Sequence, residues 1–483
     1  MLKTDNQKPV NLLIPTIGSI SLGILLFLIG GIKLALVGIA GSVCSFLSYQ
    51  YPREAILFIL IYLPFSGTII SLLGGNFLLQ FAKDAFYIPA GIAISQMCRR
   101  EYLPFIIPKG IKYLLFILLS CCLMTLLFVN LPQQFKSISG ELPIGMGILG
   151  LKIFIGYLPL ITCGYYLIRN KQDFLFISRL QVVLIVVCCV LGIVQYGLLT
   201  VDICEGTRNI VGDDLFKATL EARCFVGGAL IYSPSQGIIR LPGTFIAPWQ
   251  WGWFLISGTF FSIGTTFNDI SNRWRIFGFI SLATVFINAI ISGSRITLVL
   301  VPICCLVLLI ISEKFIQIKY PLLFFGLIIV LLNINLVFNY EFIFNQFQEV
   351  WNLLIQDGNL FFGKGLGTAT NVTRVFGETR LIESYYPKLL YEVGLFGSLS
   401  FLALVTILTV VCFKTYRSFQ NLKLRRYGAG LWAFILLISF NTFYYPLDVD
   451  PVAIYYWFWA GILLKLPKID KQETINNAEL TEI

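Results

Sequence analysis

The sequence predicts an all-α membrane protein: a polytopic bundle of about 12–14 transmembrane helices that forms one integral membrane domain over residues 1–483. Composition is the first observation, because 57% of the 483 residues are hydrophobic and only 12% are charged. The mean hydropathy of +0.83 is the second. A soluble core cannot bury so much apolar sequence, whereas a bilayer can. Third, the apolar residues fall in runs of about 20, the length that crosses a bilayer as a helix.

The candidate spans follow one another from the N-terminus with short connections. Gly30 and Gly31 separate the first two, and the fourth carries Lys83 and Asp84, which can pair or reach the interface. In chain order the spans are 11–30, 32–48, 54–73, 77–97, 113–130, 147–168, 178–199, 248–267, 274–291, 296–312, 320–339, 389–413, 427–443 and 451–466.

Lysine and arginine set the orientation. With both termini cytoplasmic, the short external connections carry only Lys33, Lys136 and Arg295, while the internal ones are rich in basic residues. Two long hydrophilic loops, at 200–247 and 340–388, then both fall on the extracytoplasmic side. The polar segment 468–483 is predicted to be a disordered cytoplasmic tail. The N-terminus lacks a small-residue cleavage site, so we expect a retained first helix.

The residue types present exclude several function classes. The net charge is +10, but the basic residues lie in short loops next to apolar segments and do not form a soluble basic domain. We therefore expect no nucleic-acid partner. The chain has no histidine and no CxxC pair. We therefore expect no metal site and no haem, and no cofactor is predicted.

Cys204 and Cys224 differ from the other cysteines, most of which lie in apolar segments, because both fall in the loop 200–247. An extracytoplasmic setting is oxidising, and closing about 20 residues with a disulfide stabilises a loop by roughly 3 kcal/mol. A disulfide between them is one expectation. Two unpaired thiols, one at the membrane surface and one in an amphipathic loop helix, are the other.

The stretch 359–397 holds the candidate chemistry. Three glycines lie close together, and such a cluster can turn backbone amides toward an anion: Gly363, Gly365 and Gly367. Arg374 and Arg380 follow and offer rigid forks that match phosphate oxygens. Glu383, which follows them, can accept a proton. GxxxxGK[ST] is absent, so a nucleotide site is not indicated.

Four motifs resemble one family. GSRITLVL (Gly293–Leu300), LFFGKGLGT (Leu360–Thr368) and ESYYPKLLYEVGLFG (Glu383–Gly397) are similar to motifs of the O-antigen ligase and polysaccharide polymerase family. RLPGTFIAPWQWG (Arg240–Gly252) resembles its shorter outer-loop motif. The resemblance covers roughly residues 180–465. Ligases of this family usually carry a histidine where Glu383 stands, so the resemblance favours a polymerase, with a ligase as the alternative.

The resemblance implies a fold of the GT-C type, found in multi-spanning glycosyltransferases that use lipid-linked sugars. It also implies glycan transfer from polyprenyl diphosphate on the outer face of a bacterial plasma membrane, without a metal ion or nucleotide. The expected partners are a polyprenyl-diphosphate-linked oligosaccharide and membrane lipids, together with a flippase and a chain-length regulator.

The predicted site combines a base with cationic donors. Glu383 and Arg380 are the predicted catalytic residues, and Arg240, Arg295 and Arg374 join the three glycines in substrate binding. Arg295 lies in an external turn against the positive-inside bias, which suggests a fixed anion nearby. The alternatives are a helical ion pair between Arg380 and Glu383, snorkelling of Arg295 to lipid phosphate, and a solvated Arg374.

A transporter or a lipid-linked oligosaccharide flippase is the alternative from another class. Transporters usually place charged groups or broken helices near mid-membrane. The predicted spans hold few ionisable groups, namely Lys83, Asp84 and Lys152, while charge concentrates in the outer loops. This distribution favours an enzyme that acts at the membrane surface over a transporter.

Overall fold

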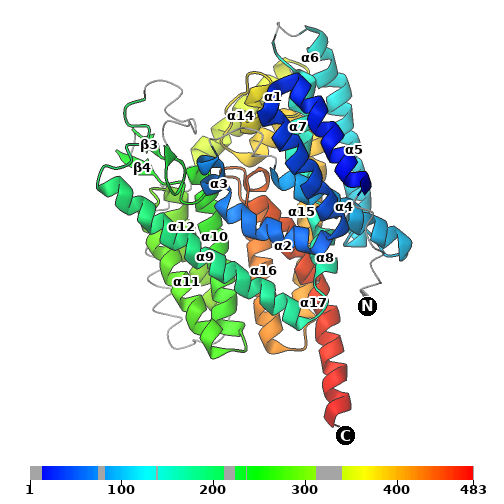
Figure 1. The fold of residues 1–483 in the computed structure, drawn as a ribbon, viewed down its shortest axis with the longest axis vertical. Helices are drawn as coiled ribbons and strands as arrows, with labels where there is room; N and C mark the ends of the chain where they lie inside the picture. Colours follow the sequence, from blue (N-terminus) through cyan, green and yellow to red (C-terminus); the bar gives the residue numbers. More distant parts are fainter. Residues whose placement is uncertain are drawn as a thin grey trace.

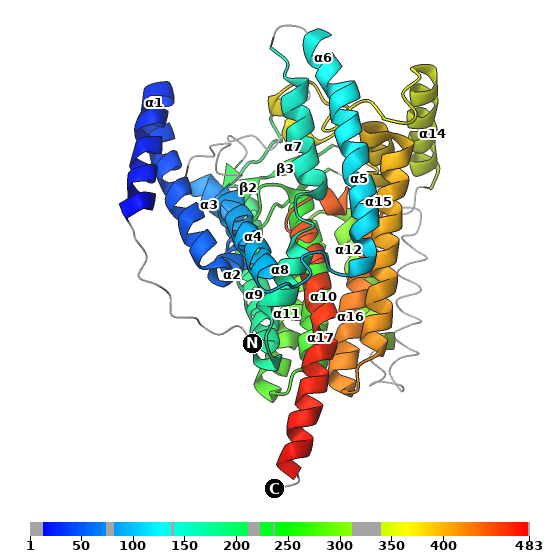
Figure 2. The same cartoon turned by 90° about the vertical axis from the view of Figure 1, so that its right-hand side faces the viewer.

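The structure is a computed structural model that describes residues 13–73, 82–136, 140–210, 223–234, 237–311 and 340–481. It is 76% helical, and Figures 1 and 2 show a helical bundle with the C-terminal helix α17 protruding at one end. Within the described residues, six helical segments are long and apolar enough to cross a membrane: Pro52–Leu72, Lys109–Lys136, Pro143–Leu167, Lys171–Thr200, Asn272–Ile291 and Tyr385–Arg417. The predicted helical membrane bundle is therefore supported.

The number of such segments is smaller than the twelve to fourteen spans predicted. Two further apolar helical stretches, Gly18–Leu28 and Arg295–Ile310, are shorter. The predicted span 320–339 lies outside the described residues. Other predicted spans also form helices, and some of these helices lie buried in the interior of the bundle.

Helix α1 (Leu13–Gln50) folds back on itself at Gly31, whose φ is +74°. A Cβ on Gly23 would lie 2.4 Å from Cγ1 of Ile39, and one on Gly38 would lie 2.1 Å from Cδ1 of Leu26. Residues 16 positions apart in a straight helix would be about 24 Å apart, so α1 must be a hairpin of two helices. The predicted division at Gly30 and Gly31 is thus confirmed.

The next helices form the side of the bundle that packs on α1 and α15. They are α2 (Pro52–Tyr62), α3 (Ser66–Leu72), α4 (Ala82–Arg100), α5 (Lys112–Thr125), α6 (Leu131–Lys136), α7 (Pro143–Ile155) and α8 (Leu160–Leu167). One π-helical turn, Leu126–Asn130, joins α5 to α6, so the two run as one rod beside α15 (Figure 2).

The centre of the bundle is built on two helices with buried aromatic residues. Helix α10 (Pro248–Asn268) is enclosed by α9 (Lys171–Thr200), α11 (Asn272–Ile291) and α12 (Arg295–Ile311), and α9 crosses them obliquely (Figure 1). Helix α17 (Val452–Thr481) packs on α8 and on α16 (Leu422–Phe440). Tyr455 and Trp459 are fully buried, so their cluster belongs to the core, not to an interfacial aromatic belt.

The C-terminal segment differs from the prediction. Residues 468–481 continue α17 as a helix instead of forming a disordered tail. Lysine, glutamine, glutamate and alanine in this segment are good helix formers. Tertiary contacts also hold it, because Asp470 accepts hydrogen bonds from the backbone of Gln420 and Asn421, and Glu473 pairs with Lys171 at 2.7 Å.

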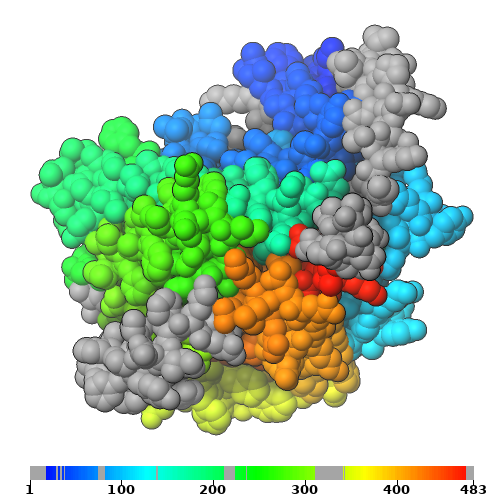
Figure 3. All heavy atoms as spheres, turned by 90° about the horizontal axis from the view of Figure 1, so that it is seen from below, coloured from blue at the N-terminus to red at the C-terminus, as the bar shows by residue number. Residues whose placement is uncertain are grey.

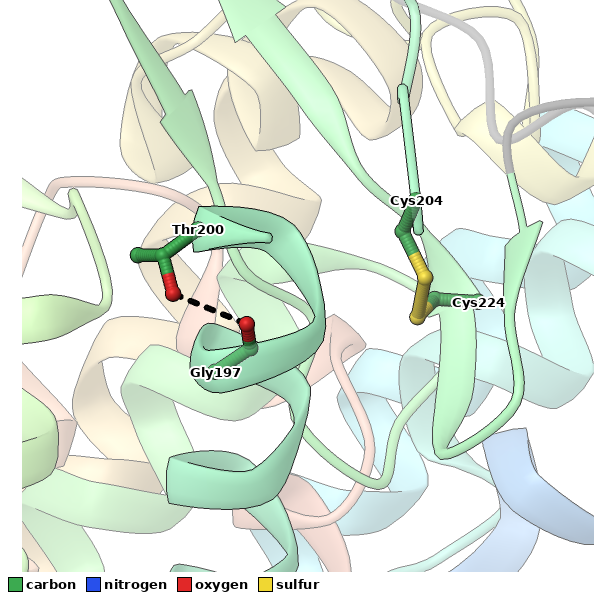
Figure 4. The surroundings of a disulfide bond; sticks show 4 residues. All are labelled: Gly197, Thr200, Cys204 and Cys224. Atoms are coloured by element: carbon green, nitrogen blue, oxygen red, sulfur yellow. Dashed lines mark hydrogen bonds between the residues drawn. A yellow bond between two sulfur atoms is a disulfide. The ribbon is translucent and has the colours of Figure 1, made fainter. Parts of the chain in front are cut away.

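The outer loop 200–247 departs from the all-α prediction, because it contains two antiparallel hairpins. They are β1–β2 (Arg223–Cys224, Gly227–Ala229) and β3–β4 (Ile231–Ser233, Ile238–Arg240). Cys204 and Cys224 form a disulfide that ties β1 to the segment after α9 (Figure 4). Cys224 lies in a strand and not in the loop helix considered as an alternative. The disulfide and its neighbours Leu230, Ile239 and Leu241 form a small hydrophobic cluster of their own.

The loop 340–388 is largely ordered. It begins with the amphipathic helix α14 (Tyr340–Gln356), passes through the glycine cluster and a short 3₁₀ helix (Asn371–Val375), and leads into α15 (Tyr385–Arg417). Helix α14 packs on the outer part of α15 through Val350 and Leu354 (Figure 2).

Helix α15 is broken at Gly394, where φ is +68° and ψ is −169°. The glycine loop closes the break. Lys364 N donates to the carbonyl of Tyr391 at 2.7 Å, and Leu395 N donates to the carbonyl of Leu360 at 2.9 Å. Gly363 has no room for a side chain, since a Cβ there would lie 2.7 Å from Gly394 N. The two motifs LFFGKGLGT and YEVGLFG therefore pack directly against each other.

We expect Gly363→Ala to lower the melting temperature of the purified protein by several degrees. The alanine would be strained at φ +73° and would also push against the backbone of α15, which adds about 1–3 kcal/mol. Gly358→Ala is the matched control, because Gly358 has φ +69° but no atom within 4 Å of its Cβ position. The control should lose only the about 1–2 kcal/mol of left-handed strain. Equal melting temperatures for the two variants would contradict the close packing.

Candidate functional site

Four segments that are distant in sequence meet at the end of the bundle that carries the β-hairpins. Arg240 ends β4, Arg295 begins α12, Glu383 precedes α15, and Tyr444 lies in the turn between α16 and α17. Backbone hydrogen bonds fix these segments together. Leu241 N donates to the carbonyl of Ser292 at 3.0 Å, and Tyr444 N donates to the carbonyl of Glu383 at 3.2 Å.

The Tyr444 hydroxyl is the common neighbour of the predicted charges. Burial raises the pKa of Tyr444; the Arg240 and Arg295 guanidinium groups oppose that rise, and the Glu383 carboxylate adds to it. Charges act on a neighbouring group strongly only over several ångströms. Together with the two backbone hydrogen bonds, and with Ile296 and Phe443 lining one pocket, this places the segments of Arg240, Arg295 and Glu383 around the turn that carries Tyr444.

Tyr444 and Tyr445 adopt an uncommon backbone conformation, with φ values of 50° and 36°. Left-handed conformations are costly for residues with a large side chain and cluster at functional sites. The Tyr445 hydroxyl accepts a hydrogen bond from Asn371 Nδ2 at 3.4 Å, which links the turn to the glycine loop. Sequence reasoning missed both tyrosines. Their signal is the pair of aromatic residues before Pro446 in YYPLDVDP.

The charged groups of the site are accessible. Glu383 and Arg295 are exposed, and Arg240 is half-buried, with Nη2 donating to Ser233 Oγ at 3.2 Å. A guanidinium group has five N–H donors, so Arg240 retains donors for an anion. The arrangement thus offers two cations and one carboxylate to a ligand in the surrounding solvent.

Arg380 and Arg374 have other partners. Arg380 pairs with Glu349 of α14 and lies 5.7 Å from the ring centroid of Tyr391. It does not form the helical ion pair with Glu383 that was the alternative, because α15 begins only at Tyr385. Arg374 is exposed and donates to Thr379 Oγ1 at 3.0 Å within its own loop. Of the five charged residues predicted, Arg240, Arg295 and Glu383 are the three that gather at Tyr444.

The glycine loop packs on the protein, and several of its backbone amides already have partners. Gly363 N donates to the carbonyl of Asn359 at 2.8 Å, Leu366 N to Oδ1 of Asn130 at 2.9 Å, and Ala369 N to Oε1 of Glu392 at 2.8 Å. A Cβ on Gly367 would lie 2.2 Å from the carbonyl oxygen of Met146 in α7. The geometry therefore gives Gly363 and Gly367 a role in close packing, and the anion cradle at the cluster stays a prediction.

An apolar pocket of about 240 Å³ opens beside the charged site. It lies between α12 and α16, and Ile296, the first lining residue, directly follows Arg295. Phe443 lines the other side and pairs with Ser384, the neighbour of Glu383. The remaining lining residues are Leu300, Leu436, Leu437, Phe440 and Asn441. An apolar groove with arginines at its entrance suits an amphiphile with an anionic head.

Three buried charges lie beneath the site. Lys388 pairs with Asp448 and lies 3.9 Å from Glu392, and the three side chains are only 2%, 6% and 3% exposed. Glu392 also accepts hydrogen bonds from Ala369 N and from Thr370 Oγ1 at 2.9 Å. This group fastens α15 both to the glycine loop and to the turn that carries Tyr444.

A second group of buried charges adjoins the same turn. Asp450 pairs with Lys83, and Asp84 pairs with Lys152 at 2.7 Å. Both lysines lie over the ring of Tyr157, at 5.7 and 5.5 Å from its centroid. The sequence pattern identified Lys83, Asp84 and Lys152 as charges within the predicted spans, and the structure adds Asp450 as a partner of Lys83.

Comparisons of the chain with protein-family models, curated proteins and solved structures found no match. The site is consequently defined by its own geometry. That geometry can bind an anion through Arg240 and Arg295, hold an apolar tail between α12 and α16, and accept a proton at Glu383.

We expect Lys388→Met to destabilise the protein by about 3–5 kcal/mol, because it leaves two carboxylates buried without a cation. Asp448→Asn should cost less, since Lys388 and Glu392 remain as a pair. Combining the two substitutions should restore part of the stability lost by Lys388→Met. Thermal unfolding of the purified variants measures this order, and a double variant less stable than Lys388→Met would contradict the coupling.

Proposed function

We propose that this protein polymerises polysaccharide repeat units at the outer face of a bacterial plasma membrane. It would be a multi-pass glycosyltransferase of the GT-C type with both termini in the cytoplasm. The donor is a glycan on polyprenyl diphosphate, and the acceptor is a sugar hydroxyl of a second lipid-linked unit. The observation that carries the proposal is the gathering of Arg240, Arg295 and Glu383 around Tyr444 at the mouth of an apolar groove.

The arginines supply the donor chemistry in this proposal. As the bond between the anomeric carbon and the diphosphate oxygen breaks, negative charge grows on the diphosphate. Guanidinium groups bind phosphate oxygens in bidentate fashion and stabilise that charge. The groove between α12 and α16 would hold the first isoprene units of the carrier next to Arg295. A diphosphate is already a good leaving group, so no general acid is required.

Glu383 supplies the acceptor chemistry. The acceptor hydroxyl attacks the anomeric carbon, a new carbon–oxygen bond forms, and the hydroxyl proton passes to the Glu383 carboxylate. Glu383 is exposed at the edge of the site, where an acceptor can reach it. It lies directly before Ser384, the residue that caps the N-terminus of α15.

A ligase that passes the glycan to a lipid or protein acceptor shares this donor chemistry. Only the glutamate at position 383, where ligases usually have histidine, favours polymerisation. The length of the surface glycan separates the two in a strain that lacks the protein. Loss of a polymerase leaves single repeat units on the final acceptor, whereas loss of a ligase leaves long glycans on the lipid carrier.

We expect Glu383→Gln to lower polymer formation by about 10²–10⁴-fold, the usual cost of losing a general base. Glutamine keeps the shape and the hydrogen bonding but accepts no proton, so the variant should remain folded and still bind lipid-linked donor. Glu378→Gln is the matched control, because Glu378 is an exposed glutamate of the same loop. Gel analysis of surface glycan measures the outcome. Near-normal polymer from Glu383→Gln at normal expression would refute the assignment.

Transport of a lipid-linked oligosaccharide, or other coupled transport, is the second candidate. Two observations favour it: the break of α15 at Gly394 and the buried ion pairs Lys388–Asp448 and Lys83–Asp450. Discontinuous helices and intramembrane charges are typical of transporters. In our proposal these features support the site instead, because loop backbone fills the break and the carboxylates are paired.

Liposomes that contain the purified protein and a pH-sensitive dye distinguish the two functions. If the protein is a glycosyltransferase, an imposed pH gradient with lipid-linked donor present should decay no faster than in empty liposomes. Proton flux that Asp450→Asn abolishes and Asp202→Asn retains would favour transport, since Asp202 is an exposed loop aspartate whose ion-pair partner is Arg208.

A further inference from the structure

A second groove lies at the opposite end of the bundle, between α9 and α11. It has a volume of about 350 Å³. Its apolar wall is one face of α9, with Leu175, Phe176, Leu180 and Val183 at helical spacing. At 1.5 Å per residue the lined face, from Gln172 to Val183, is about 16 Å long. Figure 3 views this end, where the surfaces of α9 (teal) and α11 (green) adjoin.

The polar end of the groove is formed by Arg179 and Trp274. Arg179 binds Asp269 through Nε and Nη2 at 2.9 and 2.8 Å, and its guanidinium carbon lies 5.2 Å from the Trp274 ring. Asp269 uses two of the five N–H groups, so three remain for another acceptor. Tryptophan is enriched at the membrane–water interface, where its ring contacts both lipid and headgroups.

The charge around this end favours an anion. Arg179, Arg273 and Arg275 outnumber Asp269, and Arg273 is exposed. The other nearby carboxylates are already paired, Asp173 with Arg53 and Arg169 and Glu473 with Lys171. The surrounding surface is lipid-facing in character, because Phe176 is 55% exposed and Ile276 is 62% exposed. A ligand here must therefore combine an apolar chain with an anionic head.

We infer that the groove between α9 and α11 is a binding site for an anionic phospholipid of the leaflet at this end of the bundle. One acyl chain lies along Leu175, Leu180 and Val183, and the phosphate reaches the free N–H groups of Arg179. The positive-inside distribution predicts that this leaflet is cytoplasmic. The inference is independent of the proposed glycosyl transfer, which uses the other end of the molecule.

Native mass spectrometry of the purified full-length protein tests the inference, with phosphatidylglycerol and phosphatidylcholine of identical acyl chains as probes. Wild-type protein should retain phosphatidylglycerol in preference to phosphatidylcholine. Leu180→Trp should lose the retained phosphatidylglycerol, because the larger ring fills the groove. Val190→Trp is the matched control: Val190 lies on the same helix, is 49% exposed and does not line the groove.

Arg273→Gln provides a second variant that leaves the groove intact, and it should lower the preference for phosphatidylglycerol about fivefold. Size-exclusion chromatography of each variant checks folding. Retention of phosphatidylglycerol by Leu180→Trp at the wild-type level would overturn the location of the site. Equal retention of the two lipids by the wild-type protein would overturn the selection for an anionic head.

Discussion

The backbone of α15 imposes the constraint on which the outer half of the structure depends. A helix interrupted at Gly394 leaves N–H and C=O groups without partners, and such groups are costly inside a membrane protein. The loop that begins at Leu360 supplies those partners, with Lys364 N bound to the Tyr391 carbonyl and Leu395 N bound to the Leu360 carbonyl. Only glycine fits at the crossing, since a side chain on Gly363 or Gly394 would overlap main-chain atoms.

Buried charges extend the same constraint to neighbouring elements. Glu392 holds the glycine loop through Ala369 and Thr370, and Lys388 holds the turn through Asp448. Two residues further on, Asp450 pairs with Lys83 of α4. Separating any one of these pairs would leave a charge unpaired in a poorly hydrated interior, at a cost of about 3–5 kcal/mol. Loop, turn and helices are thereby held in one arrangement.

The proposed site depends on that arrangement more than on its own contacts. Arg295 and Glu383 are exposed, so little in their immediate surroundings positions them. Their segments are instead placed by main-chain bonds between 241 and 292 and between 383 and 444, and the disulfide Cys204–Cys224 steadies the hairpins that lead to Arg240. An open mouth of this kind suits large substrates that arrive along the membrane. The ion pairs and main-chain bonds below the entrance hold the segments that carry these residues.

The sequence by itself determined the helical membrane class and the hairpin at Gly30–Gly31, because apolar run length and helix-breaking residues are local properties. It also singled out Arg240, Arg295 and Glu383. Only the tertiary structure decided that Tyr444 and Tyr445 join them, that Arg380 pairs with Glu349, and that the glycines pack against α15 and α7. It also decided that Tyr455 and Trp459 are core residues and that residues 468–481 are helical. These outcomes depend on contacts between segments that are distant in sequence. Hydrophobic and charge patterns along the chain do not show which segments make such contacts.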